Sequence, residues 1–234
     1  MGLCCNREAK NEPKYPTNIS KKAKDKIDKF FKIIQKIQKE GGGKGKVYIS
    51  EKKFEKFLKY MEVYENQSYF LSKLTKYRTD EQNISEEAFN YLEKIFSFIV
   101  GSLSEKYIGD EDLGIFENII ILSETFYYKI TENHKIYLKE KLKGKPIFND
   151  IEFWKKYSPY VIEKEIHKLI EDNKEDKGKN YREIGAFSKL IDIITNMKDF
   201  VSEKNQIKET MDELIKKYDI SEQNQIVLNE LINQ

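Results

Sequence analysis

The sequence predicts an all-α protein, and three observations carry the prediction. The 234 residues include only four Pro and eleven Gly, and four of those glycines lie between Gly41 and Gly45, so long stretches lack the residues that break helices. Apolar residues recur at helical spacing through most of these stretches, and no segment alternates apolar and polar residues long enough to predict a strand. We expect a single multi-helix domain, a bundle or an irregular α-solenoid, of about eight or nine helices behind a flexible N-terminal segment.

The chain begins Met1-Gly2-Leu3-Cys4-Cys5. Removal of Met1 would expose the Gly2 amine for N-myristoylation, and Cys4 and Cys5 would then lie beside the acyl chain as palmitoylation sites. This beginning resembles the dually acylated termini of peripheral membrane signalling proteins, although Asn6 stands where Ser or Thr is preferred. A frayed terminus with two incidental cysteines is the alternative. The sequence contains no other Cys, so a reducing, cytoplasmic location is expected.

Residues 1–18, with Pro13 and Pro16, are predicted to be the acylated, flexible terminus, and residues 19–40 a basic amphipathic helix. Its apolar stripe comprises Ile27, Phe30, Phe31, Ile34 and Ile37. The lysines around the stripe are Lys21, Lys22, Lys24, Lys26, Lys29, Lys32, Lys36 and Lys39. Such a helix suits an anionic leaflet, to which each near-surface Lys adds about 1 kcal/mol. Alternatively, the stripe packs into the protein and the lysines form its solvated face.

Charge is distributed unevenly along the chain. Residues 1–60 hold 17 Lys and Arg against 7 Asp and Glu, whereas the remainder holds 25 against 33, so a basic end precedes a mildly acidic body. A basic end predicts an anionic partner, either a membrane or a nucleic acid. No nucleic-acid reader motif is present, so we expect a membrane and no nucleic acid.

The glycines at 41–45 are predicted to end the first helix as a hinge, and they fail as a phosphate loop because Val47 follows Lys46. A helical domain is then predicted over residues 47–234. Its expected helices start near Ser50 and Ser68, run from Ser85 to Leu103, from Asp110 to Tyr127, from His134 to Leu142 and from Ile151 to Ile170, and end with Tyr181–Val201, Glu203–Tyr218 and Ser221–Ile232. The charged run Asn173–Asn180 is expected to be a loop.

No recognisable catalytic or metal-binding motif appears in the sequence. His167 and Glu163 share a helical face, but the other histidine, His134, is 33 residues earlier than His167, and a structural zinc needs about four ligands. No Gly-x-Ser-x-Gly elbow is present. We therefore expect no catalytic residue, no metal and no cofactor.

Residues 107–166 contain an aromatic-rich helix, a short Tyr-Leu-x-Glu helix, a Pro-Ile break and a Phe-Trp pair. This succession resembles the helical module of SET-binding-factor and myotubularin-related pseudophosphatases. The resemblance implies a helical module of trafficking and signalling scaffolds, without a catalytic centre. Pro146, Ile147 and Trp154 are among the matching positions, and they would either pack in the core or shape a groove for a partner peptide.

Together these features predict a non-enzymatic, lipid-anchored adaptor on the cytoplasmic face of a membrane, whose helical domain binds an unidentified protein partner in signalling or trafficking. Two alternatives remain at this stage. One is a structural component of a cytoskeletal or ciliary assembly, and the other is an enzyme whose site forms only in the fold.

Overall fold

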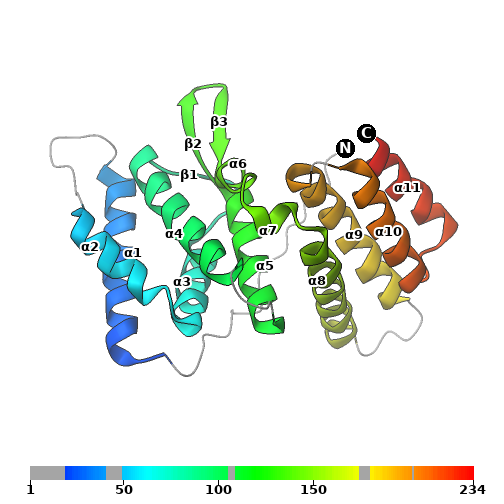
Figure 1. The fold of residues 1–234 in the computed structure, drawn as a ribbon, viewed down its shortest axis with the longest axis horizontal. Helices are drawn as coiled ribbons and strands as arrows, with labels where there is room; N and C mark the ends of the chain where they lie inside the picture. The colour runs from blue at the N-terminus through cyan, green and yellow to red at the C-terminus, as the bar shows by residue number, and fades with distance from the viewer. Residues whose placement is uncertain (1–18, 41–48, 105–108, 174–179, 202) are drawn as a thin grey trace. The chain divides into compact units, whose positions relative to one another are not determined.

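The computed structural model describes residues 19–40, 49–104, 109–173, 180–201 and 203–234. Within these ranges it contains eleven α-helices and three short strands (Figure 1). The all-α prediction is therefore confirmed. The chain divides into two compact units: unit 1 comprises the residues up to Ser102 together with Asn118–Glu140, and unit 2 comprises Leu103–Glu117 together with Lys141–Gln234.

Unit 1 is built mainly from helices that pack through aromatic and aliphatic side chains. Its helices are α1 (Lys21–Glu40), α2 (Glu51–Tyr60), α3 (Tyr64–Tyr77), α4 (Glu86–Ser104) and the second half of α5 (Asp110–Thr125). Helix α1 packs against α2 and α3, so the basic helix is part of this unit and is not separated from the helices that follow it. Two helices begin with a serine cap: Ser20 Oγ accepts from the amide of Ala23 at 3.2 Å, and Ser85 Oγ accepts from that of Ala88 at 3.3 Å.

The apolar stripe of α1 is buried within unit 1. All five of its side chains are at most 7% exposed. Of the two alternatives for this stripe, packing into the protein is the one that the structure shows. The lysines around it form the solvated face, and any membrane contact through α1 would involve these cations and not the apolar stripe.

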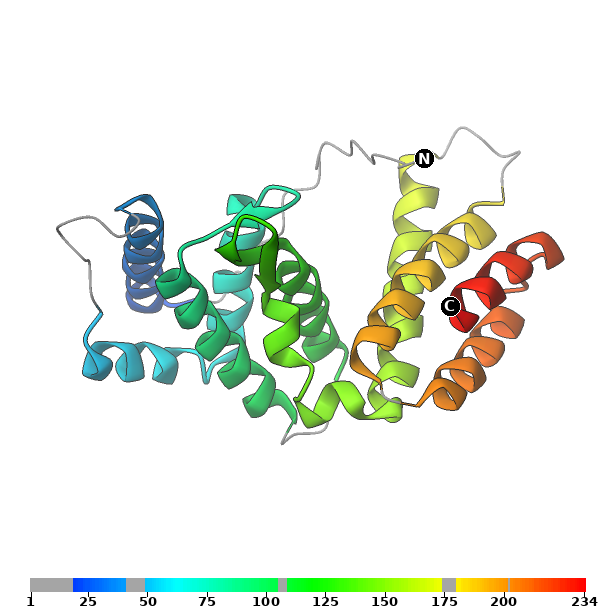
Figure 2. The same ribbon diagram turned by 90° about the horizontal axis from the view of Figure 1, so that it is seen from above.

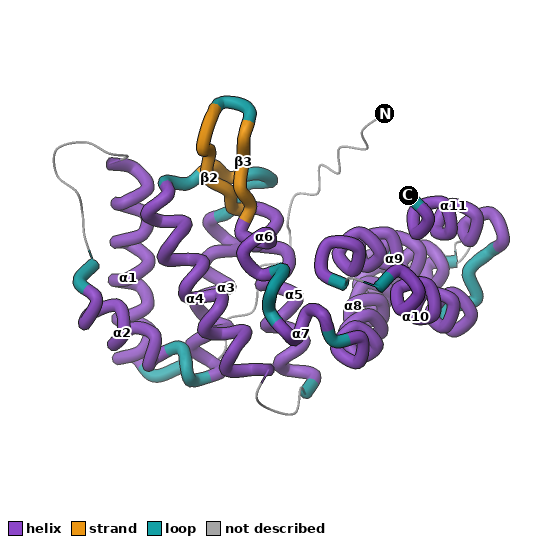
Figure 3. The backbone as a smooth tube through the Cα atoms, turned by 45° about the horizontal axis from the view of Figure 1, so that its top comes forward, coloured by secondary structure: helices purple, strands orange, loops and turns teal. Residues whose placement is uncertain are grey.

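A small sheet in unit 1 differs from the prediction. Its strands are β1 (Gln82–Asn83), β2 (Phe126–Thr131) and β3 (His134–Tyr137). They lie in the order β1-β2-β3, with β1 parallel and β3 antiparallel to β2. Helix was expected to continue to Tyr127 and to resume from His134 to Leu142. Instead α5 ends at Thr125, and of the second segment only Leu138–Leu142, which forms α6, is helical. The β2–β3 hairpin projects from the helices of unit 1 (Figures 1 and 3).

In its described residues, unit 2 contains helices and no strand. After the first half of α5, its helices are the end of α6, α7 (Pro146–Asn149), α8 (Ile151–Asp172), α9 (Tyr181–Phe200), α10 (Lys204–Lys217) and α11 (Glu222–Asn233). Helix α9 packs against α8, α10 and α11, which lie around it in Figure 2. The approach of α8 to α9 is close at Gly185, where an added Cβ would lie 3.1 Å from Ile166 Cγ1.

An aromatic cluster forms the core of unit 2 around Trp154. The Trp154 side chain has no exposed surface, and its Nε1 donates a hydrogen bond of 2.9 Å to the Phe148 carbonyl. The Phe148 ring stacks on Phe200, with centroids 4.7 Å apart. Ile147 is also buried, while Pro146 is exposed at the start of α7. Of the two alternatives for these positions, Trp154 and Ile147 take the packing in the core, whereas Pro146 does not.

Candidate functional site

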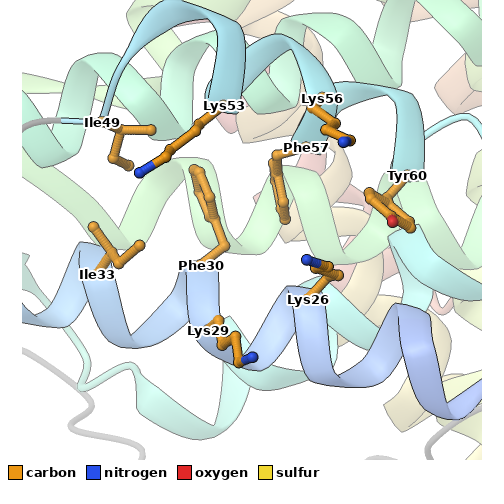
Figure 4. A pocket seen from close by; sticks show the side chains of 9 residues that line it. All are labelled: Lys26, Lys29, Phe30, Ile33, Ile49, Lys53, Lys56, Phe57 and Tyr60. Atoms are coloured by element: carbon orange, nitrogen blue, oxygen red, sulfur yellow. The ribbon is translucent and has the colours of Figure 1, made fainter.

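A pocket of about 390 Å³ opens between α1 and α2 in unit 1. Its size lies within the range of about 300–1,000 Å³ that is typical of small-molecule sites. Side chains of α1 and α2 face one another across it (Figure 4). The lining residues are Lys26, Lys29, Phe30, Ile33, Ile49, Lys53, Lys56, Phe57 and Tyr60.

The floor of the pocket is a pair of stacked phenylalanines, one from each helix. The Phe30 and Phe57 rings lie 3.7 Å apart between centroids, with an interplanar angle of 9°, and each residue is 5% exposed. Tyr91 of α4 supports the floor with an edge contact to Phe30 at 6.4 Å. The Tyr91 hydroxyl also accepts from the Ile49 amide at 3.3 Å and donates to the Ile49 carbonyl at 3.2 Å. These hydrogen bonds hold Ile49, an apolar residue of the pocket wall, in place just ahead of the first residue of α2.

The rim of the pocket is made of four lysines. Lys26 and Lys29 lie three residues apart on α1, and Lys53 and Lys56 lie three residues apart on α2, a spacing that places each pair on one helical face. All four side chains are exposed. No carboxylate lines the pocket, and among the residues that the structure describes none lies within ion-pair distance of these four lysines. The pocket thus combines an apolar floor with four positive charges.

Asp28, which lies between Lys26 and Lys29 in the sequence of α1, is bound by side chains of α3. Asp28 forms an ion pair of 2.8 Å with Lys73 of α3 and accepts a hydrogen bond of 2.9 Å from the Tyr69 hydroxyl. Partial burial raises the pKa of Asp28, but the hydrogen bonds from Lys73 and Tyr69 and the charges of Lys73 and Lys24 outweigh it, so the pKa is lowered from 3.8. Asp28 therefore ties α1 to α3, where its charge is compensated by Lys73.

The predicted lysines of α1 are divided by the fold. The seven whose side chains are described are all exposed; they are Lys21, Lys22, Lys24, Lys26, Lys29, Lys32 and Lys36. Only Lys26 and Lys29 line the pocket. The side chain of Lys39 and the predicted lipidation sites Gly2, Cys4 and Cys5 lie outside the described residues.

Sequence reasoning missed the half of the pocket that α2 contributes. Lys53 and Lys56 alternate with Phe54 and Phe57, and this pattern gives α2 a basic edge beside an apolar face. That signal was available in the sequence. The pairing of α2 with α1 was not, because it depends on how the two helices pack.

The part of the chain that the structure describes contains neither a cluster of metal ligands nor a helix that could span a membrane. There, no three His, Cys, Asp or Glu side chains gather closely enough to hold a metal ion. His134 and His167 are both exposed, on β3 and α8 respectively. None of the described helices is long and apolar enough to cross a membrane.

Comparison of the chain with protein-family models, with curated proteins and with solved structures finds no match.

Proposed function

We propose that this protein is a non-enzymatic adaptor held at the cytoplasmic face of a membrane by N-terminal acylation and by the lysines of α1. The observation that carries the proposal is the Gly2, Cys4 and Cys5 arrangement at the start of a basic segment. A single myristoyl chain binds membranes only marginally, so stable attachment requires a second signal. Both the cysteine pair and the lysines are suited to supply it.

The exposed face of α1 supports this reading. Its described lysines are exposed while its apolar stripe is buried, so these cations can approach a leaflet without unfolding of unit 1. An anionic leaflet attracts such residues by about 1 kcal/mol each near the surface. The attachment we propose is therefore electrostatic at α1 and hydrophobic at the acyl chains.

The hairpin of unit 1 supports the recruitment of a protein partner. Strand β3 lies at one end of the β1-β2-β3 order, and an edge strand is a template for pairing with an extended peptide. Ile130, near the tip of β2, is 55% exposed. The hairpin is held at its base by Glu81, which accepts from Lys135 Nζ at 2.6 Å and from the Tyr137 hydroxyl at 2.9 Å. We assign partner binding to this hairpin.

The anchor is tested by replacing Gly2, since an alanine there removes the acceptor of N-myristoylation. The Gly2→Ala protein, expressed in cells of its native source, should move from the membrane fraction to the soluble fraction. A Cys4→Ser/Cys5→Ser protein should retain only reversible binding. Mass spectrometry of the native N-terminus should show the acyl groups directly. Unchanged membrane binding of Gly2→Ala, or an unmodified native terminus, would contradict the proposal.

Partner recruitment is tested by placing a charge on the exposed end of the hairpin. Partner proteins are captured by cross-linking at the membrane. The Ile130→Lys protein should fail to capture one or more of the proteins that the wild type captures. Ile226→Lys is the matched control, because Ile226 is 60% exposed on α11 and lies in unit 2. Identical losses for both variants would mean that the hairpin is not the partner surface.

A further inference from the structure

We propose that the pocket between α1 and α2 binds the headgroup of a membrane phospholipid that carries a phosphomonoester, such as phosphatidic acid. The phosphate would lie among Lys26, Lys29, Lys53 and Lys56, and the glycerol and first methylene groups would cover the apolar walls. This inference rests on the membrane location proposed above and adds to it a lipid preference.

The charge of the rim points to a multiply charged anion. Four ammonium groups surround one opening that no carboxylate lines, so their potentials add and the site attracts negative charge. A phosphomonoester carries about −1.5 to −2 at pH 7, whereas phosphatidylserine has a net charge near −1. Lysine binds phosphate as a point charge with three donors. The phosphomonoester therefore gains more from this rim than a singly charged headgroup does.

The apolar part of the pocket points to a lipid and not to a free phosphate. Phe30 and Phe57 form the floor, and Ile33, Ile49 and Tyr60 lie beside the lysines in Figure 4. Inorganic phosphate would leave these walls uncovered. Burial of apolar surface is favourable at roughly 25 cal/mol per Å², so a ligand with a glycerol backbone and methylene groups uses a part of the site that phosphate alone does not.

The size of the pocket favours a lipid headgroup over a segment of a protein. An α-helix with side chains is about 10–12 Å across, so an acidic helical peptide would lie over a pocket of about 390 Å³ and not enter it. Two of the lysines at its edge, Lys26 and Lys29, also belong to α1, the helix of the proposed membrane-facing cations. A headgroup drawn from the leaflet would reach the pocket without a second protein.

The test uses the full chain expressed without an N-myristoyltransferase, so that acylation does not contribute. Sedimentation would compare vesicles of phosphatidylcholine alone with vesicles that also contain phosphatidic acid or, at matched total charge, phosphatidylserine. We expect the affinity for the phosphatidic acid vesicles to exceed that for the phosphatidylserine vesicles by about tenfold, the effect of one added charge-assisted hydrogen bond. Equal affinities would overturn the proposal.

A pair of charge-matched variants locates the effect. Lys29→Gln/Lys53→Gln removes one rim charge from each helix and should abolish the preference for phosphatidic acid. Lys22→Gln/Lys52→Gln removes one exposed charge from each of the same helices outside the pocket, and should weaken both kinds of binding while leaving the preference intact. If the two double variants behave alike, the lysines act as a diffuse surface charge and the pocket proposal is wrong.

The apolar contribution is tested without changing any charge. Ile33→Trp fills part of the pocket and should reduce the preference, with Ile33→Phe as a smaller replacement if the thermal midpoint of the first variant falls. Glycerol 3-phosphate should compete with vesicles much less well than a short-chain phosphatidic acid. Equal competition by the two molecules would refute the lipid assignment. Binding of an acidic amphipathic peptide through Lys29 and Lys53, in the absence of vesicle binding, would refute it as well.

The outcomes for the pocket and for the anchor are separate. If Gly2→Ala leaves the protein on membranes, the acyl anchor fails while the vesicle measurements on unacylated protein are unaffected. If the vesicle preference is absent but Gly2→Ala releases the protein, the anchor stands and the pocket proposal fails.

Discussion

Replacement of Phe30 by alanine tests whether α1 is a docked helix of unit 1, which the membrane proposal requires. Phe30 is 5% exposed and stacks on Phe57 at 3.7 Å, with a further ring contact to Phe54 at 5.9 Å. Removal of a buried Phe side chain costs about 3–5 kcal/mol. Because one side of the Phe30 ring already borders the pocket, the new void joins an existing one and neighbouring side chains have room to relax. We therefore expect a loss near the lower end, about 3 kcal/mol.

The assay is urea unfolding followed by circular dichroism, combined with hydrogen exchange to locate the change. With a urea dependence of about 1–3 kcal/mol per M, the midpoint for unit 1 should fall by roughly 1–3 M. Amides of α1 and α2 should exchange faster than in the wild type. Lys32→Ala, an exposed change on the same helix, should stay within about 0.5 kcal/mol.

The opposite pattern would refute the reasoning. If Phe30→Ala lost vesicle binding but kept its stability in the absence of membranes, the apolar stripe would be a membrane-inserting face and not part of the core. The lysines and the stripe of α1 would then have to be assigned to the same function, and the pocket would not exist as described.

Three further predictions concern other positions in the fold. Trp154→Phe removes the hydrogen bond of 2.9 Å to the Phe148 carbonyl and puts a smaller ring in the core. Together, these two changes should lower the free energy of unfolding in urea by about 2–4 kcal/mol. Gly185→Ala should destabilise by about 1–3 kcal/mol because its Cβ meets α8 at 3.1 Å, whereas Gly101→Ala, with nothing within 4 Å, should stabilise α4 by about 0.5–1 kcal/mol. Asp28→Asn should lower the free energy of unfolding at neutral pH. This difference from the wild type should disappear as the pH falls below 3.8 through the lowered pKa of Asp28 in the folded state, because protonation of the carboxylate removes the stabilisation. A difference that persisted in acid would show that the charge of Asp28 is not responsible.

Most helices could be predicted from the sequence because their apolar residues keep one period over many turns. The boundaries of α8, α9, α10 and α11 fall within about two residues of those expected. A serine indicated the start of a helix correctly where its Oγ accepts a hydrogen bond from the amide three residues later, as at Ser85. At Ser50 the helix begins as predicted, but no capping hydrogen bond is made by the side chain.

The hairpin was missed because the segment Ile119–Tyr127 contains no Gly or Pro that would mark the end of the helix at Thr125. Short apolar runs are ambiguous between a buried helix and a buried strand. The evidence for strand lies in the aromatic triplet Phe126–Tyr128 followed by Ile130 and Thr131, residue types that favour strands. What decides the outcome is tertiary: β2 pairs with β1, more than 40 residues earlier in the chain.

The pocket could be predicted only in part, for the same physical reason. The α1 lysines were visible as a basic stripe, but eight lysines gave no indication that Lys26 and Lys29 differ from the others. They differ because α2 packs beside them with Lys53 and Lys56 at the facing edge. Periodicity gives the face of a helix, whereas the partner of that face depends on non-local contacts.

The order in which the chain passes through the two units also determines when unit 1 can fold during synthesis. Unit 1 includes Asn118–Glu140, and the chain enters unit 2 at Leu103–Glu117 before returning. At about 5–20 residues per second, a ribosome that has completed α4 needs roughly 2–7 s more before β2, which pairs with β1, and β3 are made. During that interval, side chains that β2 will bury lack this part of their native packing. Phe89 is one of them, because its ring lies 4.7 Å from that of Tyr128 of β2. A nascent chain released at Ser104 would therefore be a substrate for chaperones and proteases, and any truncation intended to isolate unit 1 must extend through Glu140.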